Sequence, residues 1–191
     1  MRLKLRTELI DDADMQKGLR ADLNELGVMI KGALTTMRGS DLQEDTVPVR
    51  LDHLLQDLAS AAMASGAPLT LQTCPLEVPG KPMAIKRALG NLIDNALRYG
   101  QSVEVDMFVE GELAVVRVLD HGPGLPEGAL ERIFEPYLRL EHGMNSNSMG
   151  SGLGLWISRN AIRRHGGDIV MRNRPEGGLE ARVTLRRAGT H

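Results

Sequence analysis

A glycine-rich stretch, MGSGLGLW at residues 149–156, leads directly into an amphipathic helix. Its glycines Gly150, Gly152 and Gly154 would expose backbone N–H groups at the N-terminus of that helix, and such an arrangement suits a phosphate. The stretch is not a Walker A loop, because no Gly-Lys-Ser/Thr occurs in it. Its spacing and the lack of a surrounding parallel βαβ unit also exclude a Rossmann fingerprint. A nucleotide, if one binds, must be held by another fold.

A second candidate stretch, LDHGPGL at residues 119–125, begins where a buried strand is predicted to end. A carboxylate at a strand terminus, here Asp120, can accept hydrogen bonds from an amide or from an exocyclic amine. Gly122 and Gly124 allow the backbone to turn and a flat ligand to approach closely. Considered alone, the stretch is better explained by a tight turn with a capping aspartate.

A third stretch, NLIDNALRYG at residues 91–100, carries polar side chains at helical spacing. Asn91, Asn95 and Arg98 fall on one face at 100° per residue, with Tyr99 beside them. Two asparagines within a helix oppose its intrinsic preference, because their side chains compete for backbone hydrogen bonds. Considered alone, this face is most simply a solvated one.

The pattern of apolar residues predicts the elements that must position these stretches. We expect a central helix over 82–99, and its apolar residues share one broad arc. These residues are Ile85, Leu89, Leu92, Ile93, Ala96 and Leu97. Strands are expected at 47–51, 69–72, 102–109, 113–119, 168–172 and 179–186. Further helices are expected at 52–65 and from 154 to 165.

The connections differ in character. The proline-rich segment 74–82 is predicted to be a loop, and 126–134 to hold one short helix within a long connection from 120 to 150. Together the elements predict an α+β domain, a two-layer α/β sandwich with a mixed, largely antiparallel sheet on one side and three helices on the other.

The first part of the chain has a different texture. Residues 1–38 are expected to form a helical hairpin, because apolar residues between positions 19 and 37 step by three and four. Residues 39–46 are polar and contain Gly, Ser and Pro, which predicts a linker. We therefore expect a hairpin at 1–38, a linker at 39–46, the α+β domain at 47–187 and a tail at 188–191.

Composition limits the classes of partner. The formal net charge of the 191 residues is −2, which gives no reason to expect nucleic acid as a partner. The single cysteine, Cys74, excludes an internal disulfide framework and a cysteine-based zinc site. No apolar run reaches the roughly 18 residues needed to span a bilayer, so we expect a cytoplasmic portion of a protein. Any membrane attachment would come from segments upstream of Met1.

The polar and glycine-rich stretches together resemble, in order and spacing, the catalytic ATP-binding domain of sensor histidine kinases, within the GHKL superfamily. NLIDNALRYG resembles the N box, DHGPGL the first glycine box, FEPYLRL at 134–140 the F box, and GSGLGL at 150–155 the second glycine box. The resemblance covers about residues 47–187 and implies the histidine-kinase ATPase fold. The helical front resembles the later part of the dimerisation and histidine-phosphotransfer hairpin.

The resemblance implies that the chain uses ATP and Mg²⁺. Asn95 would ligate Mg²⁺ through its amide oxygen, since hard cations prefer oxygen ligands, and Asn91 would support the metal or the phosphates. Arg98 would neutralise phosphate charge. Residues 126–150 would form a lid over ATP, with Arg139 as a candidate contact of the γ-phosphate.

The resemblance also assigns the base pocket. Asp120 would accept a hydrogen bond from the adenine amino group, Tyr99 would pack near the adenine, and Gly122 and Gly124 would shape the pocket. The second glycine box would hinge the lid and offer N–H groups to the phosphates. Its residues in this chain are Gly150, Gly152, Leu153, Gly154 and Leu155.

The implied reaction is transfer of the γ-phosphoryl group of ATP to a histidine on the dimerisation helix, for relay to an aspartate of a cognate response regulator. The implied setting is a homodimer, assembled through the hairpin, of a bacterial inner-membrane sensor. The chain departs from the acceptor pattern, however, because Leu3 stands where the histidine would and Glu8 stands for the proline. We expect the acceptor motif to lie upstream of Met1, so that this chain would not phosphorylate itself.

Two alternatives remain open. A GHKL protein serine kinase is one, although the helical front argues against it. The other is a nucleotide-gated module that docks a response regulator without phosphoryl transfer. ATPases of the gyrase and chaperone type are disfavoured, because no catalytic glutamate adjoins the asparagines of the N box. His121 is a further departure, since Asn or Asp is commoner there, and its effect stays open.

Overall fold

The computed structural model describes residues 44–138 and 152–189, which lie in the compact unit that runs from Asp41 to His191. The expected hairpin at 1–38, most of the expected linker and part of the expected lid lie outside these ranges. The described elements form two sheets and one layer of helices. In chain order they are β1 Val47–Arg50, α4 Leu51–Ala64, β2 Leu69–Gln72, β3 Glu77–Gly80, α5 Pro82–Tyr99, β4 Val103–Glu110, β5 Leu113–Asp120, η1 Glu127–Ala129, η2 Arg132–Phe134, α6 Gly154–Arg164, β6 Asp168–Asn173 and β7 Leu179–Arg186.

The main sheet has five strands in the order β2-β4-β5-β7-β6. β2 runs parallel to β4, while β4–β5, β5–β7 and β7–β6 are antiparallel neighbours. In β4 the odd-numbered residues Val103, Val105 and Met107 are buried, as the two-residue period of a strand requires. The expected mixed, largely antiparallel sheet is confirmed.

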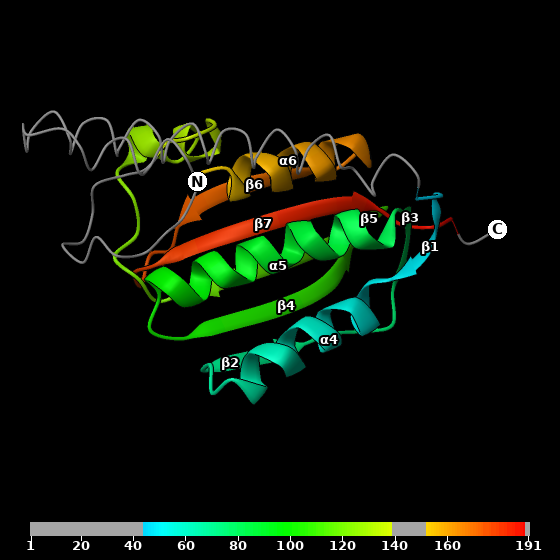
Figure 1. Ribbon diagram of the computed structural model, residues 1–191, viewed down its shortest axis with the longest axis horizontal. Coiled ribbons are helices and arrows are strands. Elements are labelled where there is room, and N and C mark those ends of the chain that lie inside the picture. The colour runs from blue at the N-terminus through cyan, green and yellow to red at the C-terminus, as the bar shows by residue number, and fades with distance from the viewer. Residues whose placement is uncertain (1–43, 139–151, 190–191) are drawn as a thin grey trace, which may run out of the picture. The chain divides into compact units, whose positions relative to one another are not determined.

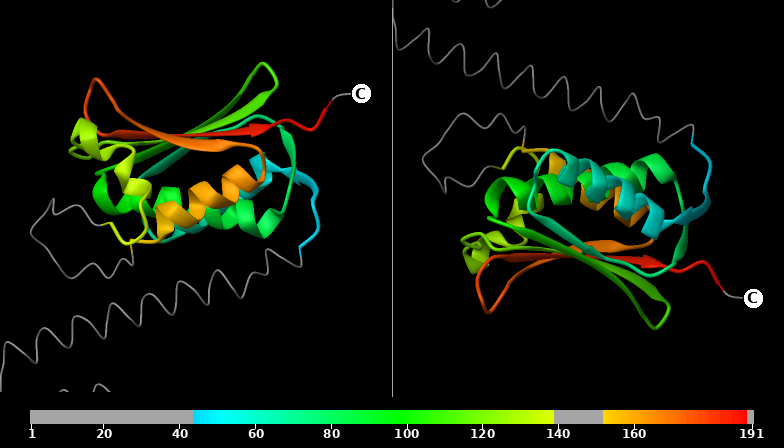
Figure 2. Two further views of the ribbon diagram at one scale, coloured as in Figure 1. Left: turned by 90° about the horizontal axis from the view of Figure 1, so that it is seen from above. Right: turned by 90° about the horizontal axis from the view of Figure 1, so that it is seen from below.

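The helices α4, α5 and α6 lie on one face of the sheet, and Figure 2 shows the two layers edge-on. α5 crosses the middle of the sheet in Figure 1, with α6 and α4 on either side of it. Its apolar arc is buried as predicted from Ile85 to Ala96, and Leu97 is half-buried at the rim. The two-layer α+β sandwich is therefore confirmed, with α5 as its central helix.

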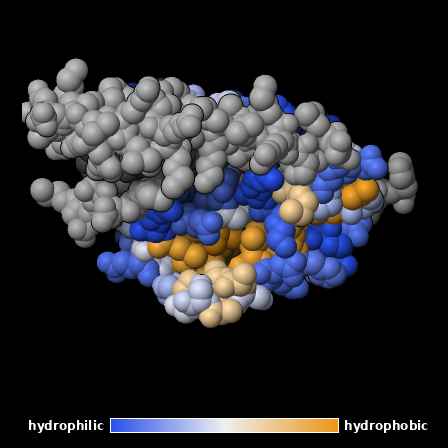
Figure 3. Space-filling model, in the orientation of Figure 1, coloured by the Kyte–Doolittle hydropathy of each residue, from blue (hydrophilic) through white to orange (hydrophobic). Residues whose placement is uncertain are grey.

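α4 and α5 approach closely at Gly90, where an added Cβ would stand 3.5 Å from Cδ2 of Leu58. Figure 3 shows mostly hydrophilic residues on the visible helix surface, with apolar residues gathered between α5 and α4. Leu58 and Leu97 are among the apolar side chains packed, partly buried, against the core. This packing fixes α5 on the sheet and leaves its polar face free for other contacts.

Two local predictions were wrong. The segment predicted as a loop contains β3, which pairs antiparallel with β1 in a separate two-stranded sheet. Its prolines hid the strand from sequence analysis, but the register pairs Pro48 with Pro79 in a small sheet where few backbone donors are required. The single helix expected over 126–134 is instead two 3₁₀ turns, η1 and η2.

Candidate ATP-binding site

Asn91 connects the polar face of α5 to the start of α6. Its Nδ2 donates to the carbonyl oxygen of Gly154 at 3.3 Å and to Oγ of Ser158 at 3.2 Å. Gly154, the first residue of α6 and part of the second glycine box, is thereby held against Asn91 of the N box. The sequence alone did not show how the three candidate stretches lie relative to one another. This hydrogen bond joins two of them.

The other predicted residues of α5 lie further along the same face. Asn95 is half-buried, Arg98 is exposed, and the side chain of Tyr99 is 59% exposed. None of these three side chains makes a hydrogen bond within residues 44–138 and 152–189. Asn95 follows Asn91 by one helical turn, so both amides belong to one face. The predicted packing of Tyr99 near adenine stays a prediction.

Asp120 is the last residue of β5 and is buried, with 7% of its surface exposed. Its Oδ1 accepts hydrogen bonds from the backbone N–H of Gly122 at 2.8 Å and of Leu179 at 3.1 Å. Both hydrogen bonds that the carboxylate makes among the described residues therefore use Oδ1. Oδ2 is left as an acceptor, which agrees with the predicted role toward an amine donor.

The first glycine box packs against the end of α5 through close backbone contacts. A Cβ at Gly122 would lie 2.7 Å from the carbonyl oxygen of Tyr99, and one at Gly100 would lie 2.7 Å from Cβ of Asp120. Side chains at these two positions would push β5 and α5 apart. The glycines therefore bring Asp120 close to the residues at the C-terminal end of α5.

Three residues that sequence analysis missed hold the first glycine box from the β6–β7 side. Asn173 accepts from the N–H of Leu125 at 2.9 Å and donates to its carbonyl at 2.7 Å. Nη1 of Arg174 donates to the carbonyl of Asp120 at 2.9 Å. Gly178 passes so close to Asp120 that a Cβ there would stand 2.0 Å from its carbonyl oxygen. The only sequence signal was the Gly177-Gly178 pair in the last turn.

His121 is held in a polar cluster at the rim of this box. Its Nδ1 lies 3.0 Å from Oγ of Ser102, and its Nε2 lies 3.3 Å from Oε1 of Glu104 and 3.4 Å from Nη1 of Arg174. The imidazole thus bridges β4 and the loop after β6. The departure from the usual Asn or Asp is accommodated by these partners.

The second glycine box forms the start of α6. Leu153 is buried and Leu155 half-buried against the core, while Gly152 has a φ of +67° that favours glycine. A Cβ at Gly152 would lie 2.9 Å from backbone atoms of Tyr137, whose N–H donates to the Gly152 carbonyl. Among the described residues no side chain caps α6, so the first N–H groups of the helix have no side-chain partner there. Uncapped N–H groups of this kind can receive a phosphate.

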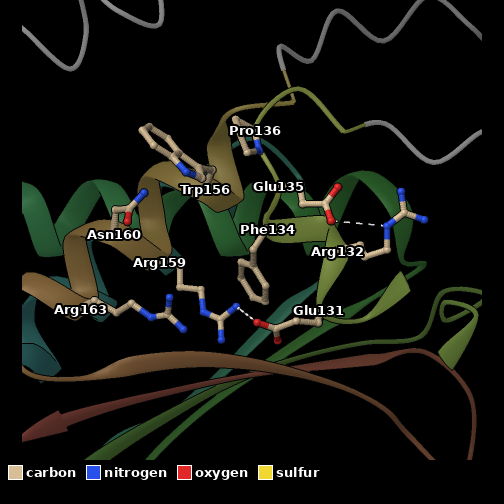
Figure 4. Close-up of a pocket in the computed structure, with 9 residues that line it drawn as sticks. All are labelled: Glu131, Arg132, Phe134, Glu135, Pro136, Trp156, Arg159, Asn160 and Arg163. Atoms are coloured by element: carbon tan, nitrogen blue, oxygen red, sulfur yellow. Dashed lines mark hydrogen bonds and ion pairs between the residues drawn. The ribbon is translucent and has the colours of Figure 1, made fainter. Parts of the chain in front are cut away.

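Arg159 joins α6 to the F-box segment. Its guanidinium, with a side chain 10% exposed, pairs with Glu131 and Asp168 and lies 4.3 Å from the ring centroid of Phe134. Figure 4 shows Arg159, Phe134 and Glu131 converging at the floor of a pocket of roughly 350 Å³. The pocket shares no residue with the predicted ATP-binding set, so we interpret this cluster as a structural junction.

The charged pairs around Asp168 set its ionisation. Burial opposes the charged form, but the hydrogen bonds from Arg159 and Arg163 outweigh it and hold the pKa of Asp168 well below its usual range. The hydrogen bond from Arg50 similarly lowers the pKa of Asp52 to about 2. Neither carboxylate belongs to the predicted site, and both stabilise the domain that carries it.

Two predicted residues, Arg139 and Gly150, lie outside the described residues. The histidines of the described ranges do not stand out as phosphate acceptors: His53 is exposed on α4, and both ring nitrogens of His165 bond to backbone groups of Ala161 and Lys81. No cluster of three or more His, Cys, Asp or Glu side chains that could hold a metal occurs in the described ranges. The amide oxygens of Asn91 and Asn95 nevertheless fit Mg²⁺, which is commonly held by few protein oxygens together with phosphates and water.

Comparison with known proteins agrees with this geometry. Residues 80–189 match the family model of histidine kinase-, DNA gyrase B- and HSP90-like ATPases. The sensor histidine kinase GtrS of Pseudomonas aeruginosa is 42% identical over 188 residues, and the sensor protein CutS of Streptomyces coelicolor is 33% identical over 177. The aligned regions cover 98% and 88% of this chain, but only 39% and 43% of the two relatives.

A solved structure gives the same result. The ATP-binding domain of PrrB from Mycobacterium tuberculosis superposes with a TM-score of 0.60 at 27% identity, covering 78% of this chain and all (100%) of that one. The chain belongs to the family of histidine kinase-, DNA gyrase B- and HSP90-like ATPases. Within this family, the chain carries an ATP-binding domain of the sensor-histidine-kinase type, so the resemblance drawn from the sequence is confirmed at the level of the family. Across the described ranges, no helix combines the length and apolar character needed to cross a membrane.

Proposed function

We propose that this chain binds Mg-ATP between α5, the end of β5 and the start of α6, and donates the γ-phosphoryl group to a protein histidine. The observation that supports the proposal is that three kinds of group lie around α5: an amide face, a buried carboxylate and an uncapped helix N-terminus. The Asn91–Gly154 hydrogen bond and the close packing of Gly122 on Tyr99 hold them there. The amide oxygens suit a cation, the carboxylate suits an amine, and the helix N-terminus suits a phosphate.

The residues have distinct roles in this proposal. Oδ2 of Asp120 accepts from the exocyclic amine of adenine, while the N–H groups at the start of α6 bind phosphate oxygens. Asn95 offers its amide oxygen to Mg²⁺, and Arg98 lies one turn further on to neutralise charge. Bound Mg²⁺ would supply charge neutralisation on the phosphates. Arg139 remains a proposed contact of the γ-phosphate.

The transfer itself requires alignment more than covalent catalysis by the protein. An imidazole nitrogen forms a bond to the γ-phosphorus, the bond from that phosphorus to the bridging oxygen breaks, and ADP leaves with the electron pair. The histidine loses its proton.

The whole protein's setting is also a proposal: a homodimeric bacterial sensor at the inner membrane, with a hairpin at 1–38 joined by a linker and a response regulator as the next phosphate acceptor.

Base recognition gives the sharpest test of the ATP site. Asp120→Asn replaces the acceptor Oδ2 by a donor, so we expect ATP and ADP binding to weaken by about tenfold or more. An inosine nucleotide presents an oxygen in place of the exocyclic amine, so its affinity should fall much less in Asp120→Asn than that of ATP. Calorimetry with and without Mg²⁺ measures both. Asp106→Asn is the matched control, since Asp106 bonds Arg117 on the neighbouring strands. Equal ATP affinity in Asp120→Asn and wild type would contradict the assigned pocket.

Transfer is tested with a separately supplied acceptor helix and γ-labelled ATP. Label in an acid-labile linkage on the helix histidine would support the kinase. Bound ATP without transfer would favour the nucleotide-gated docking module, and acid-stable label on serine would favour the serine kinase. No observation in the described residues favours either alternative.

A further inference from the structure

Ser158 is a buried polar residue for which the proposed function has given no role. It lies in the second turn of α6 and is completely buried, with 0% of its surface exposed. Its hydroxyl donates to the carbonyl of Gly154 at 2.9 Å, the usual bond of a helical serine to the residue four positions back. Because the single hydroxyl hydrogen is used there, Oγ can only accept from any other group.

The other group is the Asn91 side chain, and this fixes the orientation of its amide. Asn91 meets two atoms across the α5–α6 interface: the Gly154 carbonyl oxygen and Oγ of Ser158. Both can only accept, so the NH₂ end of the amide must face them. Both hydrogen bonds of the Asn91 side chain among the described residues are made by Nδ2. Its oxygen therefore has no competing protein donor there.

We infer that Ser158 is a positioning residue of the ATP site, which fixes the Asn91 amide with its oxygen presented to the cation and its water rather than to phosphate. Phosphate oxygens are acceptors and need a donor, but the donor end of the Asn91 amide faces α6. A hydrated cation needs oxygen ligands, which is what Asn91 offers. The inference rests on the proposed function and refines one part of it, the division of work between Asn91 and Asn95.

The two hydrogen bonds from Asn91 to α6 restrict the orientation of the Asn91 amide. An asparagine amide can rotate by half a turn with little steric cost, so a solvated Asn91 would present either end. The serine hydroxyl and the Gly154 carbonyl remove that freedom. The same contact connects the N box to the second glycine box, so the amide orientation depends on α6 remaining in place.

The test is the Mg²⁺ dependence of nucleotide affinity. Ser158→Ala removes one of the two acceptors without disturbing the helix, because alanine is the better helix former. We expect Mg-ATP binding about fivefold weaker than wild type, as for one lost hydrogen bond, and affinity in EDTA unchanged within about twofold. Asn160→Ala, on the same helix but in the Figure 4 pocket, should keep the wild-type Mg²⁺ dependence.

Two further measurements separate positioning from general packing. In an Asn91→Ala background, Ser158→Ala should have no additional effect on Mg-ATP affinity, since Ser158 acts through Asn91. In the nucleotide-free protein, the side-chain NH₂ resonances of Asn91 should shift in Ser158→Ala and stay in place in Asn160→Ala. An equal loss of affinity in EDTA and in Mg²⁺, or unmoved Asn91 resonances, would overturn the inference. Failure of the wild-type chain to bind ATP would overturn the proposed function as well, whereas ATP binding with unaltered Mg²⁺ dependence in Ser158→Ala would overturn the inference alone.

Discussion

At the scale of single residues, the neighbourhood of Asp120 depends on a glycine that sequence analysis did not single out. Gly178 has a φ of +91°, and a Cβ on it would stand 2.0 Å from the carbonyl oxygen of Asp120. The next residue, Leu179, donates its N–H to Oδ1 of Asp120. The last hairpin therefore sets the position of the carboxylate that we assign to the base.

Gly178→Ala should consequently destabilise the domain more than Gly177→Ala does. Gly177 also has a positive φ, +97°, but a Cβ there would meet nothing within 4 Å. We expect about 1–2 kcal/mol for the backbone strain alone at Gly177, and at least about 2 kcal/mol more at Gly178, where the backbone must move. Urea unfolding of the two variants gives the difference directly. Equal midpoints would mean that the contact with Asp120 is not tight.

At the scale of elements, α6 holds the F-box segment through Arg159. Arg159 and Arg163 both bond Asp168, but only Arg159 also contacts Glu131 and Phe134. The two arginines also differ in burial, since their side chains are 10% and 51% exposed. They form a matched pair for testing what this junction contributes.

Arg159→Met should cost about 2–3 kcal/mol of unfolding free energy, because a buried ion pair loses one partner. Arg163→Met should cost less than about 1 kcal/mol, as for an exposed pair. Hydrogen exchange of peptides covering 127–138 should become faster in Arg159→Met and stay unchanged in Arg163→Met, since only Arg159 of the two arginines contacts Glu131 and Phe134. Similar exchange in both variants would show that the F-box segment is held by other contacts.

At the scale of the whole domain, two carboxylates with lowered pKa make stability depend on acidity. Asp52, at the start of α4, has a pKa lowered to about 2 by Arg50, and the pKa of Asp168 is lowered by Arg159 and Arg163. The unfolded chain therefore binds protons at a pH where the native domain does not. The resulting stability is fully present above about pH 5 and is lost as pH falls toward the folded-state pKa.

The melting temperature should accordingly fall between about pH 5 and pH 2, and Asp52→Asn should flatten part of that decline. The variant is expected to be about 1–2 kcal/mol less stable at pH 7, where the ion pair is formed, and closer to wild type near pH 2.5. Thermal unfolding across this range measures the slope. A parallel decline in wild type and Asp52→Asn would assign the acid sensitivity to other carboxylates.

Long elements with a single strong periodicity could be predicted from the sequence. Short elements whose structure depends on contacts with another element could not. The apolar arc of α5 and the antiparallel hairpins followed from local spacing, because burial on one face imposes that spacing. β3 was missed because Pro79 masks its strand character, and its pairing with β1 is decided by a segment about 30 residues away. The segment expected to form one helix over 126–134 forms two 3₁₀ turns, and the second of them, η2, contacts Arg159 of α6 through Phe134.

The sequence by itself determined the set of chemical groups in the candidate site: two amides on α5, a carboxylate at a strand end and glycines around the start of a helix. It could do so because these groups recur at fixed local spacings that the backbone geometry translates into one face or one turn. Only the tertiary structure decided how each group is oriented. Ser158, Asn173, Arg174 and Gly178 act on the site from α6 and from the β6–β7 side, and their contacts with Asn91, Leu125 and Asp120 span between 48 and 67 residues of sequence. Such contacts leave no periodic signal in the chain, because they exist only after the sheet and helices have packed.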